Sequence, residues 1–155
     1  MSKAIGIDYH GVITANPKLF SVLTKIIRCL NYDVHIITGS RTTELLREQL
    51  SEYDISYTHI FSISDYHHGQ GTAMSGYDEH QPKIDDETWN WTKALYCKEH
   101  CISLHIDDSE VYGRYFTTPY LLFKGGANPS IFAQQSEAEM KKIIIDAFMS
   151  EVNLK

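Results

Sequence analysis

This sequence of 155 residues has few of the features that mark secreted, membrane or nucleic-acid-binding proteins. Its three cysteines, Cys29, Cys97 and Cys101, are too few and odd in number for a disulfide framework, so we expect reduced thiols. Lysine and arginine total 14 against 20 acidic residues and are scattered, which argues against a nucleic-acid or anionic-membrane surface. There is no apolar run near the ~20 residues that a membrane span needs. Residues 1–3 lead directly into an apolar stretch instead of a signal peptide, so we expect a cytoplasmic protein.

Sequence motifs of several common nucleotide and metal sites are also missing. The chain has no Gly-x-x-x-x-Gly-Lys phosphate loop, which gives no support for a kinase or a GTPase. The segment 69–71 is Gly-Gln-Gly, but it lacks the third glycine and the following helix of a dinucleotide fingerprint. Neither the neighbours His67 and His68 nor the pair Cys97 and Cys101 matches a standard zinc pattern. We expect the histidines to be surface residues and the cysteines to pack as small hydrophobic side chains.

Short apolar segments alternate with amphipathic ones along a chain of ordinary globular composition, 43% hydrophobic and 22% charged. This alternation predicts one α/β domain over residues 1–155, a Rossmann-like three-layer α/β/α sandwich with a central, mostly parallel five-stranded sheet. The segment from about 64 to 84 has no helical or strand period and is predicted to be a loop insertion. Strands are expected at 3–7, 33–38, 59–63, 102–106 and 120–123, and helices at 17–30, 42–51, 85–100 and 136–148.

Three of the expected strands end in polar side chains. Asp8 follows the first strand, Thr38 ends the second, and Asp107 and Asp108 follow the fourth. Because the carboxyl ends of parallel strands share one edge of a sheet, these residues are expected to converge there. Carboxylates brought together repel one another unless a cation neutralises them, and Mg²⁺ prefers oxygen ligands. The alternative is that three unrelated strand ends are polar by chance, since strand exits usually are.

The order of these motifs resembles that of the haloacid dehalogenase (HAD) superfamily of phosphatases over about the whole chain. The matching segments are Asp8-Tyr9-His10-Gly11-Val12, the sequence Ile-Ile-Thr-Gly at 36–39, a helical lysine and the Asp107-Asp108 pair. The resemblance implies a Mg²⁺-dependent phosphatase in which Asp8 forms an aspartyl-phosphate. It further implies phosphate binding by Thr38, Gly39 and the lysine, and metal binding by Asp8, His10 through its backbone carbonyl, Asp108 and Asp107.

Two lysines are the main candidates for the helical position of this pattern. Lys93 lies on the helix that leads into the Asp107 strand, as in compact family members, and is our prediction. Lys83 follows Pro82 in the loop and matches other members less closely, and Lys98 is a weaker third candidate. The alternative role for all of them is that of solvated surface lysines.

The sequence departs from the family at His10, where the resemblance expects a second aspartate. Histidine titrates near neutral pH, so it can act as the general acid and base in place of a carboxyl group. The substitution also leaves open a HAD-fold binding or regulatory protein with a degenerate, weakly active or inactive site. No segment is long enough for a cap domain, so the resemblance implies a phosphorylated substrate of unknown size. The oligomeric state is left open.

Overall fold

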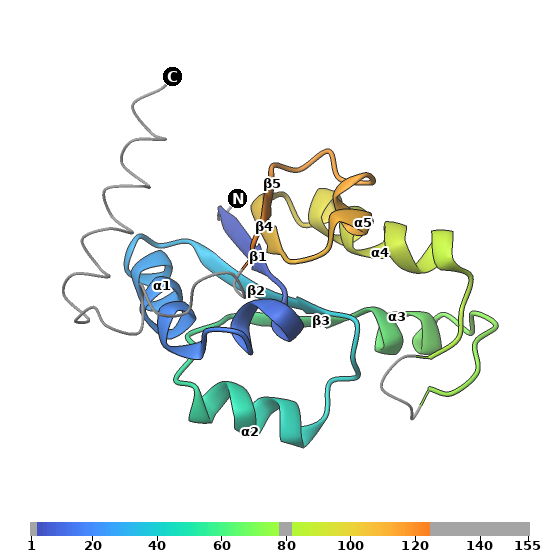
Figure 1. Cartoon of the computed structure of the whole chain (residues 1–155), viewed down its shortest axis with the longest axis horizontal. Coiled ribbons are helices and arrows are strands. Elements are labelled where there is room, and N and C mark those ends of the chain that lie inside the picture. Colours follow the sequence, from blue (N-terminus) through green and yellow to red (C-terminus); the bar gives the residue numbers. More distant parts are fainter. Residues whose placement is uncertain (1–2, 78–81, 125–155) are drawn as a thin grey trace.

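Five parallel strands form the centre of the protein, in the order β3-β2-β1-β4-β5. The structure is a computed structural model that describes residues 3–77 and 82–124 (Figure 1). Since β1 is the middle strand, the residue that follows it emerges at the centre of the sheet edge. The strands are β1 (Ala4–Ile7), β2 (Asp33–Thr38), β3 (His59–Ser62), β4 (Ile102–Asp107) and β5 (Tyr120–Leu122).

The helices begin at the capping residues that the sequence provides. Asn16 accepts a hydrogen bond from the Leu19 amide at 3.1 Å, ahead of a proline at the first helical position. Asp85 accepts one from the Thr88 amide at 2.9 Å. The helices are α1 (Pro17–Cys29), α2 (Glu44–Glu52), α3 (Ile63–Gly69), α4 (Asp86–Glu99) and α5 (Glu110–Gly113).

Successive side chains of the central strands point to opposite faces of the sheet, and each face is covered by different helices (Figure 1). Ile5, Ile7, Val34 and Ile36 pack in one hydrophobic cluster with residues of α1 and α2. Ala4 and Ile37 pack in a second cluster with Tyr96 and Cys97 of α4. The predicted three-layer α/β/α sandwich with a central parallel sheet is therefore confirmed.

The segment predicted to be a loop insertion, from about 64 to 84, begins with a short helix that the prediction missed. Its first part is α3, which begins where the Ser62 hydroxyl accepts a hydrogen bond from the Asp65 amide at 3.0 Å. Further along, the backbones of Ser75 and Lys83 pair through hydrogen bonds of 3.0 and 2.8 Å. A seven-residue helix is too short to show a hydrophobic period in the sequence, which explains the error.

Two smaller expectations also need correction. His67 is buried, with Nε2 2.7 Å from the Thr92 hydroxyl, whereas His68 is exposed as expected. Cys97 is buried as predicted, but Cys101 is exposed. No helix within the described ranges is long and apolar enough to cross a membrane. The helix predicted at 136–148 lies outside the described residues.

Candidate active site

Three charged side chains from three elements meet at the end of the central strand. Asp8 follows β1, and its backbone amide donates a 2.9 Å hydrogen bond to the Ile106 carbonyl of β4. Lys93 extends from α4, and its Nζ lies 2.8 Å from Asp8 Oδ1 and 2.7 Å from Asp107 Oδ2. The exposed fractions are 5% for Asp8, 1% for Lys93 and 0% for Asp107. These groups therefore form a buried ion triad with one positive and two negative charges.

Asp107 is the most firmly held member of the triad. Its Oδ1 accepts a hydrogen bond from the Ser109 amide at 2.9 Å, and its Oδ2 lies 3.1 Å from His105 Nε2. Within the described part of the chain His105 Nδ1 has no hydrogen-bond partner, so we assign the ring proton to Nε2, which donates to Asp107. Burial alone would raise the pKa of Asp107, but the His105 hydrogen bond and the Lys93 ammonium lower it to about 2. Asp107 is thus an ionised anchor for Lys93.

The pKa of Asp8 is shifted in the opposite direction from that of Asp107. Burial raises its pKa to about 7 in spite of the Lys93 ammonium, and the negative charge of Asp107 contributes to the rise. Burial and the charge of Asp107 also raise the pKa of Asp108. The single ammonium group therefore does not fully compensate the carboxylates, and the site favours a further positive charge.

The carboxylates offer the donor set that a hard divalent cation needs. One oxygen from each of Asp8, Asp107 and Asp108 can be chosen so that all three lie within 4.8 Å of one another. Gly11 makes room for this arrangement, because a Cβ there would lie 2.1 Å from Asp108 Oδ2, and its φ of +76° favours glycine. The residues present therefore fit Mg²⁺ in donor type and in charge. Since both oxygens of Asp107 already accept hydrogen bonds, Asp8 and Asp108 are the better ligands.

A cleft with a volume of about 460 Å³ opens above this cluster. Asp8, His10, Gly39, Lys93 and Asp108 line it, so five of the seven predicted site residues border one space. The wall also includes Gly11, Ser40, Pro82, Ile84, Asp86, Trp89, Asn90, Ser109 and Tyr112.

Two predicted site residues, Thr38 and Asp107, do not line the cleft, and both are completely buried. The Thr38 hydroxyl accepts a hydrogen bond from the Ser40 amide at 3.2 Å, so it holds the turn after β2. Ser40 is instead the hydroxyl that borders the cleft, and its Oγ lies 3.0 Å from His10 Nε2. The imidazole of His10 and the hydroxyl of Ser40 are therefore neighbours within hydrogen-bond distance in the cleft wall.

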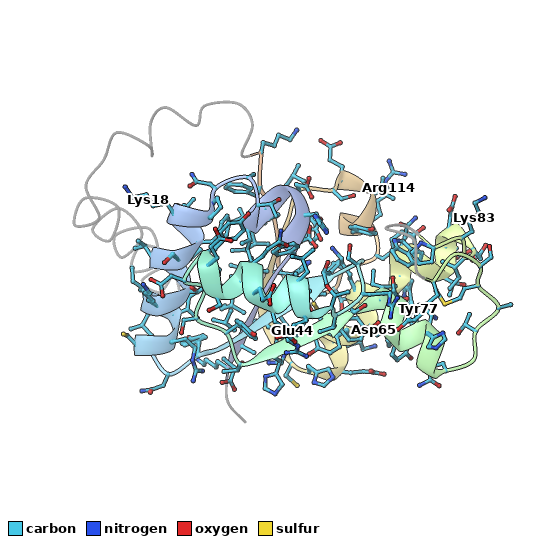
Figure 2. The ribbon with its side chains drawn as sticks, turned by 90° about the horizontal axis from the view of Figure 1, so that it is seen from below. Lys18, Glu44, Asp65, Tyr77, Lys83 and Arg114 are labelled. Carbon is cyan, nitrogen blue, oxygen red and sulfur yellow. The ribbon has the colours of Figure 1, made fainter. Side chains whose placement is uncertain are left out.

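The structure separates the candidate lysines clearly. Lys93 contacts Asp8, as described above. Lys83 is exposed, and Figure 2 shows it at the outer edge of the molecule, away from the sheet. Lys98 is also exposed. Among these three, Lys93 alone lies in the charged cluster.

Sequence reasoning missed two aromatic residues of the cleft. Trp89 Nε1 donates a 2.9 Å hydrogen bond to the Tyr112 hydroxyl, and Lys93 Nζ lies 4.5 Å from the centre of the Tyr112 ring. The signal for Trp89 was its position four residues before Lys93, which places both on one helical face. Tyr112 lies in α5, a four-residue helix without a recognisable sequence pattern.

Comparisons with known proteins assign the chain to no family. No family model matches the chain, and no curated protein matches it. One similar solved structure is the cobalt-bound form of deoxy-D-mannose-octulosonate 8-phosphate phosphatase from Haemophilus influenzae. The similarity covers 94% of this chain and 88% of that chain, at 15% identity and a TM-score of 0.46, which is too distant to assign an activity. The resemblance to the HAD superfamily rests on the order of the sequence motifs.

Proposed function

We propose that this protein is a Mg²⁺-dependent phosphomonoesterase that acts through an aspartyl-phosphate on Asp8. The observation that carries the proposal is the contact between the Asp8 carboxylate and the Lys93 ammonium at the floor of a cleft. A carboxylate that borders such a space, beside a buried cation, can attack a bound phosphate group. Asp108 adds a second oxygen donor to the same cleft.

In the first step, a carboxylate oxygen of Asp8 attacks phosphorus while the bond from phosphorus to the alcohol oxygen breaks. The alcohol oxygen keeps the bonding electron pair and takes a proton from the imidazolium of His10, which lines the cleft. Lys93 offsets negative charge on the phosphate oxygens near Asp8. The products of this step are the free alcohol, neutral His10 and phosphorylated Asp8.

In the second step, His10 accepts a proton from water as the water oxygen attacks phosphorus. The bond from phosphorus to Asp8 breaks, which releases inorganic phosphate and restores the Asp8 carboxylate and the His10 imidazolium. Mg²⁺, held by Asp8, Asp108 and the His10 carbonyl, would supply positive charge that reduces the repulsion between Asp8 and the phosphate oxygens.

The test is hydrolysis of p-nitrophenyl phosphate with and without Mg²⁺, by the wild type and by Asp8→Asn. We expect Mg²⁺-dependent turnover in the wild type and none in the variant, because an amide of nearly the same shape is far less nucleophilic. Beryllofluoride should bind the wild type and not Asp8→Asn. Residual activity of the variant within a few-fold of the wild type would move the chemistry elsewhere. Mg²⁺ binding without turnover would favour a binding or regulatory protein with a degenerate site at His10.

A further inference from the structure

One face of α4 forms a continuous side of the cleft. Asp86, Trp89, Asn90 and Lys93 all line the cleft and follow the spacing i, i+3, i+4 and i+7, so they lie along one stripe of the helix. With a rise of ~1.5 Å per residue, Asp86 is about 10 Å further along the helix axis than Lys93. If phosphate binds at Asp8 and Lys93, the rest of a substrate extends past Trp89 towards Asp86.

The outer half of this stripe has negative charge, and no lysine or arginine compensates it among the described residues of the cleft wall. Lys93 is the one lysine or arginine among the described residues that line the cleft, and it is held by Asp8 and Asp107. Two nearby cations are not part of the wall: Lys83 is exposed, and the Arg41 guanidinium lies 4.2 Å from the centre of the Tyr77 ring. A second anionic group on a substrate would therefore meet Asp86 without a positive partner.

Trp89 gives the same region an aromatic wall in a fixed position. A Cβ on Gly39 would lie 2.9 Å from Trp89 Cζ2, so the indole packs directly against the loop after β2. Its Nε1 is held by the Tyr112 hydroxyl at 2.9 Å. An aromatic ring near a carboxylate is a combination that attracts ammonium groups, through the ring quadrupole and through charge.

Resting on the proposed phosphatase function, we propose that the cleft selects phosphomonoesters of amino alcohols. The phosphate binds at the Asp8 end, the ammonium group of the alcohol binds between Trp89 and Asp86, and Asn90 borders the intervening chain. Esters whose alcohol carries a second phosphate or a carboxylate are disfavoured, and uncharged alcohols are intermediate. The acidic residue Glu87 lies in the same first turn of α4 but does not line the cleft. A variant of Glu87 is therefore the control that distinguishes binding of the substrate's ammonium group from a general effect of negative charge at the start of the helix.

The size of the effect follows from Coulomb's law. A unit charge about 6 Å from Asp86, at an effective dielectric constant of roughly 40, changes the dissociation constant by about tenfold. The sign is favourable for an ammonium group and unfavourable for a carboxylate. We therefore expect about a hundredfold difference between two substrates of one length that differ only in this charge.

Three esters of similar length provide the probes: 3-aminopropyl, butyl and 2-carboxyethyl phosphate. Their dissociation constants would be measured by calorimetry at low ionic strength, with Mg²⁺ present, on the Asp8→Asn variant so that nothing is turned over. We expect 3-aminopropyl phosphate to bind most tightly and 2-carboxyethyl phosphate most weakly, each about tenfold from butyl phosphate. Adding Asp86→Asn should bring the three constants together, whereas adding Glu87→Gln should preserve their order.

Wild-type turnover of the same esters separates failure of this inference from failure of the proposed function. The expected order of binding without hydrolysis would refute the phosphatase and leave the recognition of amino-alcohol phosphates standing. If 2-carboxyethyl phosphate is hydrolysed with a kcat/KM equal to or above that of 3-aminopropyl phosphate, the inference is overturned and the phosphatase function stands. Equal effects of Asp86→Asn and Glu87→Gln, or no binding of any ester, would also overturn the inference.

Discussion

Replacing Lys93 with methionine tests the buried ion triad directly. Methionine keeps most of the length and volume of the side chain and removes the ammonium that lies 2.8 Å from Asp8 and 2.7 Å from Asp107. The two carboxylates then lose the cation between them while both stay buried. Removing one partner of a buried ion pair typically destabilises a protein by about 3–5 kcal/mol, and we expect a loss in this range at pH 8 without metal.

The loss should be smaller at pH 5.5 than at pH 8. Burial raises the pKa of Asp8 to about 7 in the wild type, above its ordinary value of 3.8, so the folded protein binds the proton more tightly than the unfolded chain. The stability from this carboxyl group is therefore fully present below pH ~4 and is lost as pH rises through about 7. Without Lys93 its pKa rises further, and protonation at pH 5.5 removes one of the two uncompensated charges.

Urea unfolding followed by circular dichroism, in EDTA at both pH values, measures these differences. With a slope of ~2 kcal/mol/M, the expected loss lowers the midpoint at pH 8 by about 2 M. Lys83→Met is the control, because Lys83 is exposed, and it should change stability by no more than ~0.5 kcal/mol. Adding Asp8→Asn to Lys93→Met should recover part of the loss, since one buried charge is then absent. A loss below ~1 kcal/mol at pH 8 would refute the triad as a stabilising element.

Three further predictions concern the metal, the proton donor and a distant histidine cluster. Asp108→Asn should weaken Mg²⁺ binding measured by calorimetry, and equal affinity in both proteins would exclude Asp108 as a ligand. His10→Ala should slow turnover by the ~10²- to 10⁴-fold that a general acid contributes, and His10→Asp should change the pH profile of kcat; if neither does, His10 is a bystander. Burial, followed by the neighbours His59 and His100, lowers the pKa of His35 to about 4. A lowered pKa means that the unfolded chain binds the proton more tightly, so this stability is present above pH ~6.5 and is lost as pH falls towards about 4. His35→Gln should flatten that part of the urea-midpoint profile, and an unchanged profile would exclude His35 as its source.

The regular elements could be predicted because they are long enough to show a period or a cap. The observed ranges of α1 and α4 agree with the sequence to within one residue at each end, since Asn16 and Asp85 mark where they begin. By contrast, α3 and α5 contain seven and four residues, and their sequences carry no period. Their formation depends on contacts with distant residues, such as the hydrogen bond between Tyr77 and Asp65 (Figure 2).

The convergence of the acidic residues could be predicted because parallel strands share one carboxyl edge. The direction of each side chain could not, because it depends on the turn that follows the strand. Thr38 and Asp8 both lie at strand ends. The Thr38 hydroxyl, however, accepts a hydrogen bond from the Ser40 amide and does not line the cleft, whereas Asp8 borders the cleft. Likewise, helical spacing identifies the residues that share a face with Lys93, but only packing shows that this face borders the cleft.

The charged cluster extends further from the cleft than any motif indicates. His105 is completely buried and donates to Asp107, which in turn holds Lys93 against Asp8. Along β4, His105 and Asp107 are two residues apart, so they lie on the same face of the sheet and can make this contact. A sequence motif describes the residues that meet a ligand, whereas the hydrogen bonds that orient those residues come from the strand interior. The position of Lys93 is therefore set by α4 on one side and, through Asp107, by a buried histidine of β4 on the other.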